Sequence, residues 1–432
     1  MPREPICVVG LWHLGCVVAA CWAELGHRVV GVDPSAPVVE ALRAGKAPIF
    51  EPGLEDLIGK NVQAGRLSFT AGAGEAARGA RFAFIAFDTP VDEDDRSDLA
   101  PLERALDALA PVLERGAIVV VSSQVPVGTC RRWRQRLRAA SPHGEVDLVY
   151  SPENLRLSEA IACYLHPDRV VLGADDAATA ARVVELFSPM AAPVLTMTLP
   201  SAEMAKHALN GFLATSVSFI NEIATLCEAS GADVLAVAEA LRTDARIGRR
   251  AFLSPGFGFA GGTLARDVQV LKETGKRAAA ATPLLDGVLD VNRRRPGLVL
   301  RRLTEVLGGV AGRTIGVLGL TYKAGTSTLR RSVALDVIAS LVGAGARVKA
   351  FDPAADLSEL EGRAKFEAAA DPYAAAHGAS ALVVLTEWPE FRHLDFERLR
   401  GVMAQPVLLD GKNLLADLDL AARGFRYLGV GR

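Results

Sequence analysis

Short apolar runs alternate with amphipathic stretches along most of this chain. The first unit of the pattern has an apolar run at Ile6–Gly10, an amphipathic stretch at Leu14–Leu25 and a second run at Arg28–Val32. Runs of this length predict buried strands, and the stretch between them has the period of a helix. Strands that alternate with helices predict an α/β fold with a doubly wound parallel sheet.

The alternation continues through the first half of the chain. Further strands are predicted at Phe82–Phe87, Ala117–Ser122, Asp147–Tyr150 and Arg169–Leu172, and a helix at Leu99–Leu113. Thr89, Ser123 and Glu153 each follow the end of one of these strands. Ligands in doubly wound folds bind at the carboxyl ends of the strands, so these positions are candidates for a binding site.

One long helix is predicted near the middle of the chain, at Ser201–Ala229. The segment has no proline and one internal glycine, and Ser201 and Gly231 are suitable N-cap and C-cap residues. At 1.5 Å per residue the helix is about 40 Å long, enough to cross a domain. Its apolar positions at helical spacing are Met204, Ala208, Phe212, Val217, Ile220 and Ile223.

Two polar residues of this helix are candidates for chemistry. Lys206 and Asn210 are four residues apart, so they point the same way, and Asn221 falls near the same stripe. They form either a solvated face or an ammonium and an amide that face a cleft between domains. The helix alone leaves both interpretations open.

The second half repeats the opening pattern. Helices are predicted at Asp233–Leu241 and Asp267–Ala280, and the glycine-rich loop Pro255–Gly262 between them is either a flexible hinge or backbone wrapped around a ligand. VVGL…GHRVVGVDP then recurs as VLGL…GARVKAFDP, which predicts a second α/β sheet. Its predicted elements are strands at Thr314–Leu318, Arg347–Phe351, Ala381–Leu385 and Val407–Leu409 and a helix at Ser332–Val342.

These patterns predict three domains: two Rossmann-like α/β domains at residues 1–199 and 297–432, and a central helical domain at residues 200–296. The length of 432 residues suits two or three domains. With 48 basic and 50 acidic residues, no charge excess favours nucleic acid or an anionic membrane. No apolar run of 18 residues suggests a membrane span and no signal peptide is evident, so a cytoplasmic protein is expected.

The six cysteines are scattered without the spacing of metal ligands. Reduced thiols and no metal site are therefore expected. The cysteines are Cys7, Cys16, Cys21, Cys130, Cys163 and Cys227.

The loop after the first strand is a candidate dinucleotide site. It reads Gly10-Leu11-Trp12-His13-Leu14-Gly15, which has the first and third glycines of GxGxxG but Trp12 at the second. Asp33 follows the next strand, where a carboxylate can hold the ribose diol of NAD and disfavour the 2′-phosphate of NADP. Trp12 must turn away from a pyrophosphate or displace the loop. A plain strand–helix–strand crossover is the alternative.

Separated motifs extend these observations over essentially the whole chain. They are PIFEPGL at Pro48–Leu54, VPVGT at Val125–Thr129, SPENLR at Ser151–Arg156, the Lys206 and Asn210 pair, RIG at Arg246–Gly248, the glycine-rich loop before Asp267, GLTYK at Gly319–Lys323, TEW at Thr386–Trp388 and DGKN at Asp410–Asn413. Their order and spacing resemble the UDP-glucose/GDP-mannose dehydrogenase family. Each motif alone is common, whereas the set together is specific.

The resemblance implies an enzyme that oxidises the C6 alcohol of a nucleotide sugar twice with NAD. In this family a cysteine thiolate adds to the first product, an aldehyde, and water cleaves the thioester that the second oxidation leaves. The resemblance also implies NAD in the amino-terminal domain, the UDP part of a UDP-hexose in the carboxyl-terminal domain, and a homodimer formed through the long helix.

Site residues follow from the matching motifs. The implied catalytic residues are Glu153, Lys206, Asn210, Asp267 and, at the nucleophile's position, Thr263. The implied cofactor-binding residues are Gly10, Trp12, Leu14, Gly15, Asp33, Thr89, Gln124 and Arg330. The implied substrate-binding residues are Leu155, Arg156, Phe259, Gly261, Lys323 and Arg246, the last reaching the substrate of the partner subunit.

The chain departs from the family pattern around the second oxidation. Thr263 stands where the family's GFGGSCFPKD has its cysteine, and Arg266 stands where it has the lysine. Leu157 replaces the second glutamate of SPEFLRE, and Gln124 replaces the threonine of STVPVGT. Cys163, ten residues after Glu153, is the least implausible relocated thiol.

A threonine hydroxyl needs a general base to attack an aldehyde, and no histidine motif offers one. The sequence therefore favours an oxidoreductase that stops at the C6 aldehyde or its hydrate. One alternative is a transient oxidation that allows epimerisation or elimination before the hydride returns. Others are a non-catalytic nucleotide-sugar binder and slow acid formation through a bound hydrate. Net release of NADH would indicate the oxidoreductase that stops at the aldehyde, and isomerisation of the sugar without NADH would indicate the transient oxidation. Neither product would indicate the non-catalytic binder.

Overall fold

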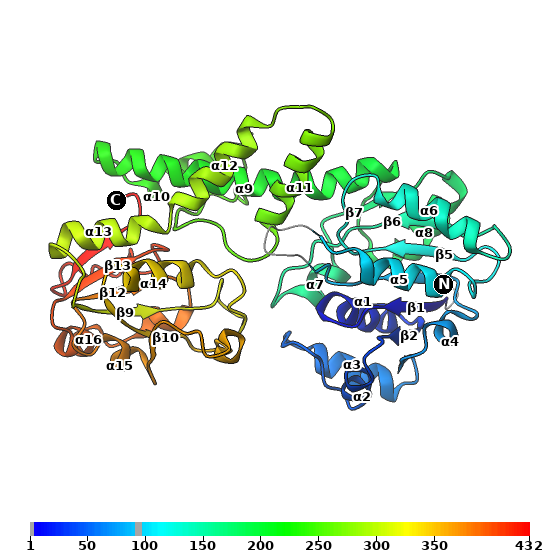
Figure 1. Cartoon of the computed structure of the whole chain (residues 1–432), viewed down its shortest axis with the longest axis horizontal. Coiled ribbons are helices and arrows are strands. Elements are labelled where there is room, and N and C mark those ends of the chain that lie inside the picture. The colour runs from blue at the N-terminus through cyan, green and yellow to red at the C-terminus, as the bar shows by residue number, and fades with distance from the viewer. Residues whose placement is uncertain (1–3, 91–96) are drawn as a thin grey trace. The chain divides into compact units, whose positions relative to one another are not determined.

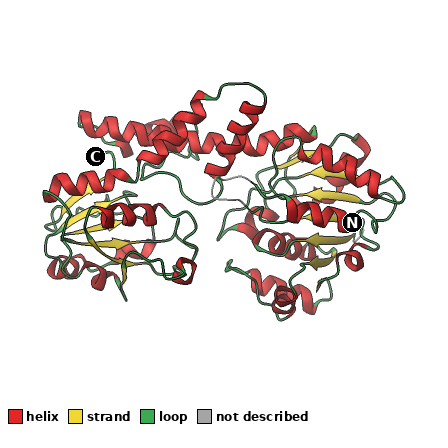
Figure 2. Ribbon diagram, viewed as in Figure 1, coloured by secondary structure: helices red, strands yellow, loops and turns green. Residues whose placement is uncertain are grey.

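The computed structural model describes residues 4–90 and 97–432. Its contacts divide the chain into two compact units, Met1–Ala208 and Leu209–Arg432, which are described separately below. The division falls within the long helix, and the three-domain division at residues 199 and 296 stays a prediction. Figures 1 and 2 show an α/β sheet in each unit.

Unit 1 is built on a sheet that, among the described residues, has eight strands in the order β3-β2-β1-β4-β5-β6-β7-β8. Neighbouring strands are parallel except for β6 and β7, so the doubly wound parallel sheet is confirmed with one antiparallel pair added. The strands are β1 Pro5–Val9, β2 Arg28–Val32, β3 Leu67–Thr70, β4 Phe82–Ile85, β5 Ile118–Val121, β6 Asp147–Tyr150, β7 Val170–Gly173 and β8 Val194–Met197.

Helices cover both faces of this sheet. One buried apolar cluster joins α1, α3, α7 and α8 to the strands, and a second joins α4, α5 and α6 to the opposite face. The helices are α1 His13–Glu24, α2 Ala36–Arg43, α3 Leu54–Gln63, α4 Ala73–Ala77, α5 Ala100–Leu109, α6 Thr129–Ala140, α7 Ala160–Leu165 and α8 Ala177–Phe187.

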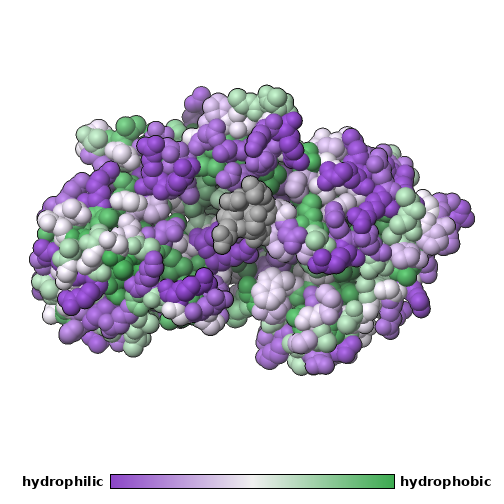
Figure 3. Space-filling view, in the orientation of Figure 1, coloured by the Kyte–Doolittle hydropathy of each residue, from purple (hydrophilic) through white to green (hydrophobic). Residues whose placement is uncertain are grey.

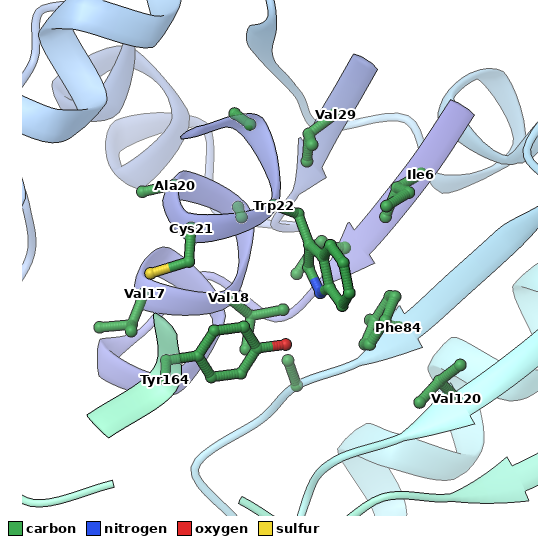
Figure 4. Close-up of a cluster of buried hydrophobic side chains, with 14 of the residues drawn as sticks. Ile6, Val17, Val18, Ala20, Cys21, Trp22, Val29, Phe84, Val120 and Tyr164 are labelled. Carbon is green, nitrogen blue, oxygen red and sulfur yellow. The ribbon is translucent and has the colours of Figure 1, made fainter. Parts of the chain in front are cut away.

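The core under α1 is packed around one indole. Trp22 is fully buried, and its ring lies 5.6 Å from the ring of Phe84 and 5.1 Å from that of Phe187. Figure 4 shows Trp22 and Phe84 in this cluster together with Tyr164. Aromatic packing at these distances stabilises the helix on the sheet beyond the area that it buries. Trp22 lies near the carboxyl-terminal end of α1, so this packing anchors that end of the helix on the sheet.

Helix α9, Leu199–Ser230, is the long predicted helix. It begins two residues earlier than predicted because Thr198 supplies the cap: its Oγ1 accepts a hydrogen bond from the amide of Ser201 (3.4 Å), and Pro200 is tolerated in the first turn. The left-handed C-cap is confirmed at Gly231, which has a φ of +73°. The amide of Ala232 donates to the carbonyl of Cys227 (3.0 Å), as such caps require.

The predicted apolar residues of α9 do not share one environment. Val217 and Ile220 are buried, whereas Phe212, Phe219 and Leu226 are 70%, 48% and 59% exposed. These three residues, spaced by seven, form an apolar stripe that the described chain leaves uncovered.

Among the described residues, unit 2 holds the rest of α9, seven further α-helices and the second sheet. The helices that follow α9 are α10 Val234–Thr243, α11 Leu264–Arg277, α12 Pro283–Arg294 and α13 Gly297–Leu307. Helix α11 begins three residues before the predicted start. Thr263 holds the N-cap position without a side-chain cap hydrogen bond, and Asp267 lies in the first turn, where an acidic side chain is favourable. Parts of α9, α11 and α12 enclose a small apolar cluster of their own.

The second sheet is all parallel, and its order β11-β10-β9-β12-β13-β14 matches that of the first six strands of unit 1. Its strands are β9 Thr314–Leu318, β10 Arg347–Phe351, β11 Glu367–Ala368, β12 Ala381–Val384, β13 Val407–Asp410 and β14 Arg426–Gly429. Its helices are α14 Val333–Gly343, α15 Pro372–Ala376 and α16 Phe396–Val402. The predicted internal repeat is therefore a repeat of fold.

Three short 3-10 helices complete the elements of the described residues: η1 Ser188–Met190, η2 Leu357–Leu360 and η3 Pro389–His393. Within residues 4–90 and 97–432, no helix has the length and apolarity to cross a membrane. All six cysteines are free thiols. The face drawn in Figure 3 is largely hydrophilic, with small apolar areas between charged ones.

Candidate functional site

The loop between β1 and α1 has the geometry of a phosphate-binding turn. Gly10 has a φ of +95°, and a side chain there would meet the ring of Phe87 at 2.8 Å. A Cβ at Gly15 would lie 1.6 Å from the carbonyl oxygen of Gly10, so only glycine lets α1 approach the strand this closely. Trp12 is the N-cap residue of α1 with a φ of −97°, and it is 50% exposed. Its backbone therefore does not require glycine.

Asp33 lies just beyond the carboxyl end of β2 and faces the same loop. One carboxylate oxygen accepts from the amide of Leu11 (3.0 Å) and the other from the amide of Ser35 (2.9 Å). Each oxygen keeps a further lone pair, which a ribose hydroxyl could use. The two required glycines, the helix N-terminus and this carboxylate together fit an NAD molecule.

The strand order reverses between β1 and β4, and polar groups gather there. Thr89 is buried and donates from its hydroxyl to the carbonyl of Gln124 (2.8 Å). Asp88 accepts from the amide of Leu14, in the first turn of α1 (3.0 Å). Sequence reasoning missed Asp88, although its place just after β4, beside the first strand, was a usable signal.

Lys206 and Glu153, both predicted catalytic residues, lie together in unit 1. Lys206 is 7% exposed; its ammonium donates to the carbonyl of Glu153 and lies 3.8 Å from that residue's carboxylate. The Glu153 carboxylate accepts in turn from the amide of Leu155. Arg156 is exposed and pairs with Glu159 (3.2 Å). The SPENLR loop is therefore organised around the ammonium of Lys206.

A buried carboxylate that the sequence analysis missed ties this loop to α1. Glu51, in PIFEPGL, accepts from the amides of Ser158 (3.0 Å) and Ala160 (2.9 Å), and it lies 2.9 Å from Nε2 of His13. Ser158 has a φ of +70°, an uncommon conformation for serine. A glutamate within a largely apolar motif was the available signal.

Gln124, which replaces the family's threonine, is buried against α9. Its Nε2 donates to Nδ1 of His207 (3.4 Å), and Nε2 of that histidine donates to the carbonyl of Val125 (2.8 Å). Nearby, Glu203 accepts from the amides of Gly128 and Cys130 at the start of α6. Burial raises the pKa of the Glu203 carboxyl.

In unit 2 the start of α11 brings three predicted residues together. The amide of Asn210 donates to the carboxylate of Asp267, and both side chains are buried. Thr263 is exposed one turn earlier, and no side chain or backbone group of the described residues is hydrogen-bonded to its hydroxyl. The Thr263 hydroxyl therefore has no hydrogen-bonded base among the described residues of unit 2.

The glycine-rich loop is fixed by buried donors and acceptors. Arg295, 4% exposed, donates twice to the carbonyl of Gly256 (3.0 and 2.7 Å), and Asn221 accepts from the amide of Gly256 (2.8 Å). Asn292 bonds both the amide (2.7 Å) and the carbonyl (3.1 Å) of Phe259. Burial lowers the pKa of Arg295 to about 10. These contacts argue against a flexible hinge.

The far end of this loop packs on the segment after β9. The amide of Gly261 donates to the carbonyl of Arg331 (3.1 Å), and a Cβ at Gly261 would lie 3.1 Å from the ring of Tyr322. The guanidinium of Arg330 is next to Gly262. Predicted residues Phe259, Gly261 and Arg330 thus lie on touching loops, and partly buried Lys323 follows Tyr322.

Asp352, the counterpart of Asp33 in the second sheet, is fully engaged. One oxygen accepts from the amides of Leu320 (2.7 Å) and Thr321 (3.0 Å) and from the indole of Trp388 (3.0 Å). A Cβ at Gly319 would lie 2.5 Å from Thr386. The second sheet therefore repeats the fold of the first but has no open carboxylate for a ribose diol.

Arg246 is the predicted residue that stays apart from these loops. Its side chain is exposed and pairs with Asp244 (2.6 Å), and this hydrogen-bonded guanidinium lowers the pKa of the Asp244 carboxyl.

Comparison with known proteins gives the family. Over residues 4–191 the chain matches the NAD binding domain of the UDP-glucose/GDP-mannose dehydrogenase family, over residues 200–294 its central domain, and over residues 316–417 its UDP binding domain. UDP-glucose 6-dehydrogenase TuaD of Bacillus subtilis (strain 168) is 38% identical, covering 99% of this chain and 93% of that relative. UDP-glucose 6-dehydrogenase of Rhizobium meliloti (strain 1021) is 38% identical, covering 99% of both.

A solved structure of a similar protein supports the same family. A UDP-glucose dehydrogenase from Pyrobaculum islandicum superimposes with a TM-score of 0.90 at 35% identity, covering 100% of this chain and 99% of that one. The NAD binding domain confirms the cofactor prediction over the plain crossover. The chain belongs to the UDP-glucose/GDP-mannose dehydrogenase family of NAD-dependent nucleotide-sugar dehydrogenases.

Proposed function

We propose that this protein oxidises the C6 alcohol of a UDP-hexose with NAD and stops at the aldehyde or its hydrate. The observation that carries the proposal is Thr263. It caps α11 one turn before the Asn210–Asp267 pair, and its hydroxyl has no base among the described groups of its unit. The role of nucleophile at this position comes from the family motif.

The chemical difference between the two nucleophiles is large. A cysteine thiol has a pKa of about 8.5 and is partly ionised at neutral pH. A hydroxyl is a weak nucleophile that adds to an aldehyde efficiently only when a neighbouring base takes its proton. An oxygen ester would also need hydrolysis with Leu157 and Gln124 where the family has glutamate and threonine.

Four of the six cysteines are poor substitutes for the missing thiol. Cys7, Cys16, Cys21 and Cys130 are buried, and burial raises the pKa of each thiol, for Cys7 to about 12. Thiolate formation is therefore unfavourable at these four sites. Cys227 is also buried, and partly exposed Cys163 lies in α7.

The groups needed for the first oxidation remain. Lys206 and Asn210 lie one turn apart on α9, and both donate hydrogen bonds, so we assign them to the alkoxide that develops at C6. The alcohol proton leaves to a carboxylate, for which Glu153 beside Lys206 is the candidate. When bound, NAD would supply the acceptor for the hydride that leaves C6. One alcohol and one NAD thus give one aldehyde, one NADH and one proton.

The UDP-hexose substrate is proposed from the relatives. The match to a UDP binding domain at residues 316–417 supports UDP, and the relatives named UDP-glucose 6-dehydrogenase support a hexose. The other site residues keep their predicted roles as proposals: Gly10, Trp12, Leu14, Gly15, Asp33, Thr89, Gln124 and Arg330 for NAD, and Leu155, Arg156, Arg246, Phe259, Gly261 and Lys323 for substrate.

We also propose a homodimer through α9, with Arg246 contributing to the partner's site. The uncovered stripe of Phe212, Phe219 and Leu226 supports the contact. Apolar residues in such a row are typical of a helix that buries them in an interface.

The test measures NADH and the sugar product together. The protein is incubated with NAD and UDP-, GDP- or TDP-hexoses, NADH is followed by absorbance, and the sugar is identified by mass spectrometry. One NADH per sugar with a C6 aldehyde or hydrate supports the proposal. Two NADH per sugar with uronate overturns it, as do isomerisation without NADH and no conversion of any sugar.

A matched pair of lysine variants checks that the activity belongs to this site. Lys206→Ala removes the cationic neighbour of the alkoxide, a loss of about 3–4 kcal/mol in such sites, so NADH formation should fall about 10²–10³-fold. Lys60→Ala removes an exposed lysine that pairs with Glu24 on α1 (2.6 Å) and should leave the rate unchanged.

A further inference from the structure

The amide of Leu14 is already hydrogen-bonded to a carboxylate of the chain. This carboxylate belongs to Asp88, the third residue after β4, and it accepts from the Leu14 amide at 3.0 Å. The approach of Phe87 to Gly10, where a Cβ would lie 2.8 Å from the ring, fixes the segment before Asp88 against the cofactor loop. A carboxylate is therefore held at the N-terminus of α1.

That end of the helix is where a dinucleotide places its charge. In a strand–glycine loop–helix unit the pyrophosphate binds the free amides of the first helical turn, and the helix dipole favours it there. Leu14 is the second residue of α1, so its amide is one of these donors. A carboxylate oxygen on this amide occupies the bonding position that a phosphate oxygen would take.

We propose that Asp88 competes with the pyrophosphate of NAD at the N-terminus of α1 and so lowers the affinity of the chain for its cofactor. The side chain must leave the Leu14 amide before a phosphate oxygen can bind it. Once displaced, the carboxylate remains attached to a segment beside the loop and repels the incoming charge.

A second carboxylate, that of Asp33, also bonds an amide of this loop but has a different role. Asp33 bonds the amide of Leu11 in the same loop (3.0 Å), but it faces the ribose position, where hydroxyl groups donate to it. The negative charges of Asp88 and Asp33 both add to burial in raising the pKa of Cys16 in α1, which agrees with two carboxylates near one helix end. Only Asp88 holds an amide that the pyrophosphate needs.

The test compares ligands with and without a pyrophosphate. NAD, ADP-ribose and adenosine are titrated calorimetrically into wild-type protein and into the Asp88→Asn and Asp88→Ala variants. Asparagine keeps the shape and an acceptor oxygen but loses the charge. We expect both variants to bind NAD and ADP-ribose at least about tenfold more tightly, because a like charge near the phosphates is removed.

Adenosine and a matched variant serve as controls. Adenosine carries no phosphate, so its affinity should be the same in all the proteins. Glu185→Gln removes one exposed charge on α8 of the same unit and should leave all three affinities unchanged. The advantage of Asp88→Asn should also shrink as salt is raised, since screening weakens the repulsion in the wild type.

Two results would overturn the proposal. One is equal or weaker binding of ADP-ribose by both Asp88 variants, which would make Asp88 a ligand or a bystander. The other is an equal gain for adenosine, which would mean a general change of the loop.

Discussion

At the scale of single residues, cofactor choice depends on Asp33. Both carboxylate oxygens are fixed by backbone amides, of Leu11 (3.0 Å) and Ser35 (2.9 Å), so the charge cannot easily move away from a 2′-phosphate. We expect NADP to bind at least about tenfold more weakly than NAD by calorimetry, because two like charges meet. The ratio should narrow in Asp33→Asn, and equal affinities in the wild type would contradict the assignment.

Thr263 gives the second prediction at this scale. Thr263→Cys restores the thiol but leaves Gln124, Leu157 and Arg266 unchanged around the missing step. Groups that act as a unit are not additive, so this variant should form little uronate, and reversion of all four positions should form far more. Mass spectrometry of the product measures both. Efficient uronate formation by the single variant would show that the other three positions matter little.

The motif residues of the candidate site could be predicted from the sequence, whereas the long-range contacts that support them could not. The pair of Lys206 with Glu153 and the pair of Asn210 with Asp267 involve residues singled out by their motifs. The supporting contacts of Glu51 with Ser158 and of Arg295 with Gly256 join positions far apart in sequence. Local spacing has no information on such contacts, since tertiary packing decides which backbone groups need a buried partner.

At the scale of elements, apolar pattern predicted the strands that are covered on both faces. Asp147–Tyr150 and Thr314–Leu318 have the predicted bounds. Val194–Met197 has no fully buried residue, and Glu367–Ala368 is two residues long and exposed, so neither has the apolar run that marks a strand. Helix α9 begins earlier than predicted because Thr198 caps it, whereas α11 begins at Leu264 without a side-chain cap hydrogen bond from Thr263.

Asp147 links two elements of unit 1 and gives a prediction for pH. Burial favours a higher pKa, but hydrogen bonds from Arg134 (3.1 Å from Nη2), the amide of Leu148 (2.8 Å) and Thr179 (3.0 Å) outweigh it and hold the pKa below its usual value. A lowered pKa stabilises the fold above the ordinary aspartate value of about 3.9, and this contribution is lost as pH falls through the folded value.

We therefore expect Asp147→Asn to lower the free energy of unfolding by about 1–3 kcal/mol at pH 7, because charged donors lose their anion. The difference from wild type should shrink below about pH 4, as the carboxyl becomes protonated first in the unfolded protein and then, at lower pH, in the folded protein. The free energies of unfolding of the two proteins are measured by urea denaturation at pH 7 and again below about pH 4. Asp107→Asn is the control. It removes an exposed carboxylate of α5 that pairs with Arg136, and it should change the free energy of unfolding little. A difference that grows on acidification would contradict the prediction.

At the scale of the whole molecule, the stripe on α9 predicts how two copies associate. Phe212, Phe219 and Leu226 are spaced by seven residues, so they lie close to one line along the helix. Two such helices can bury both stripes against each other, and large side chains at the centre of an interface each contribute about 2 kcal/mol or more. We expect the wild type to be a dimer at micromolar concentration by light scattering.

The double variant Phe212→Glu, Phe219→Glu tests that contact. Four charges would enter the centre of a two-fold interface, so the variant should be monomeric at the same concentration. Phe50→Glu alters a phenylalanine of unit 1 that is 73% exposed and lies outside α9, and this control variant should remain a dimer.

Loss of the dimer should also lower NADH formation if Arg246 completes the partner's site, because in its own chain this guanidinium pairs with Asp244 (2.6 Å). A fully active monomeric double variant would refute the role of Arg246, and a monomeric wild type would refute the dimer.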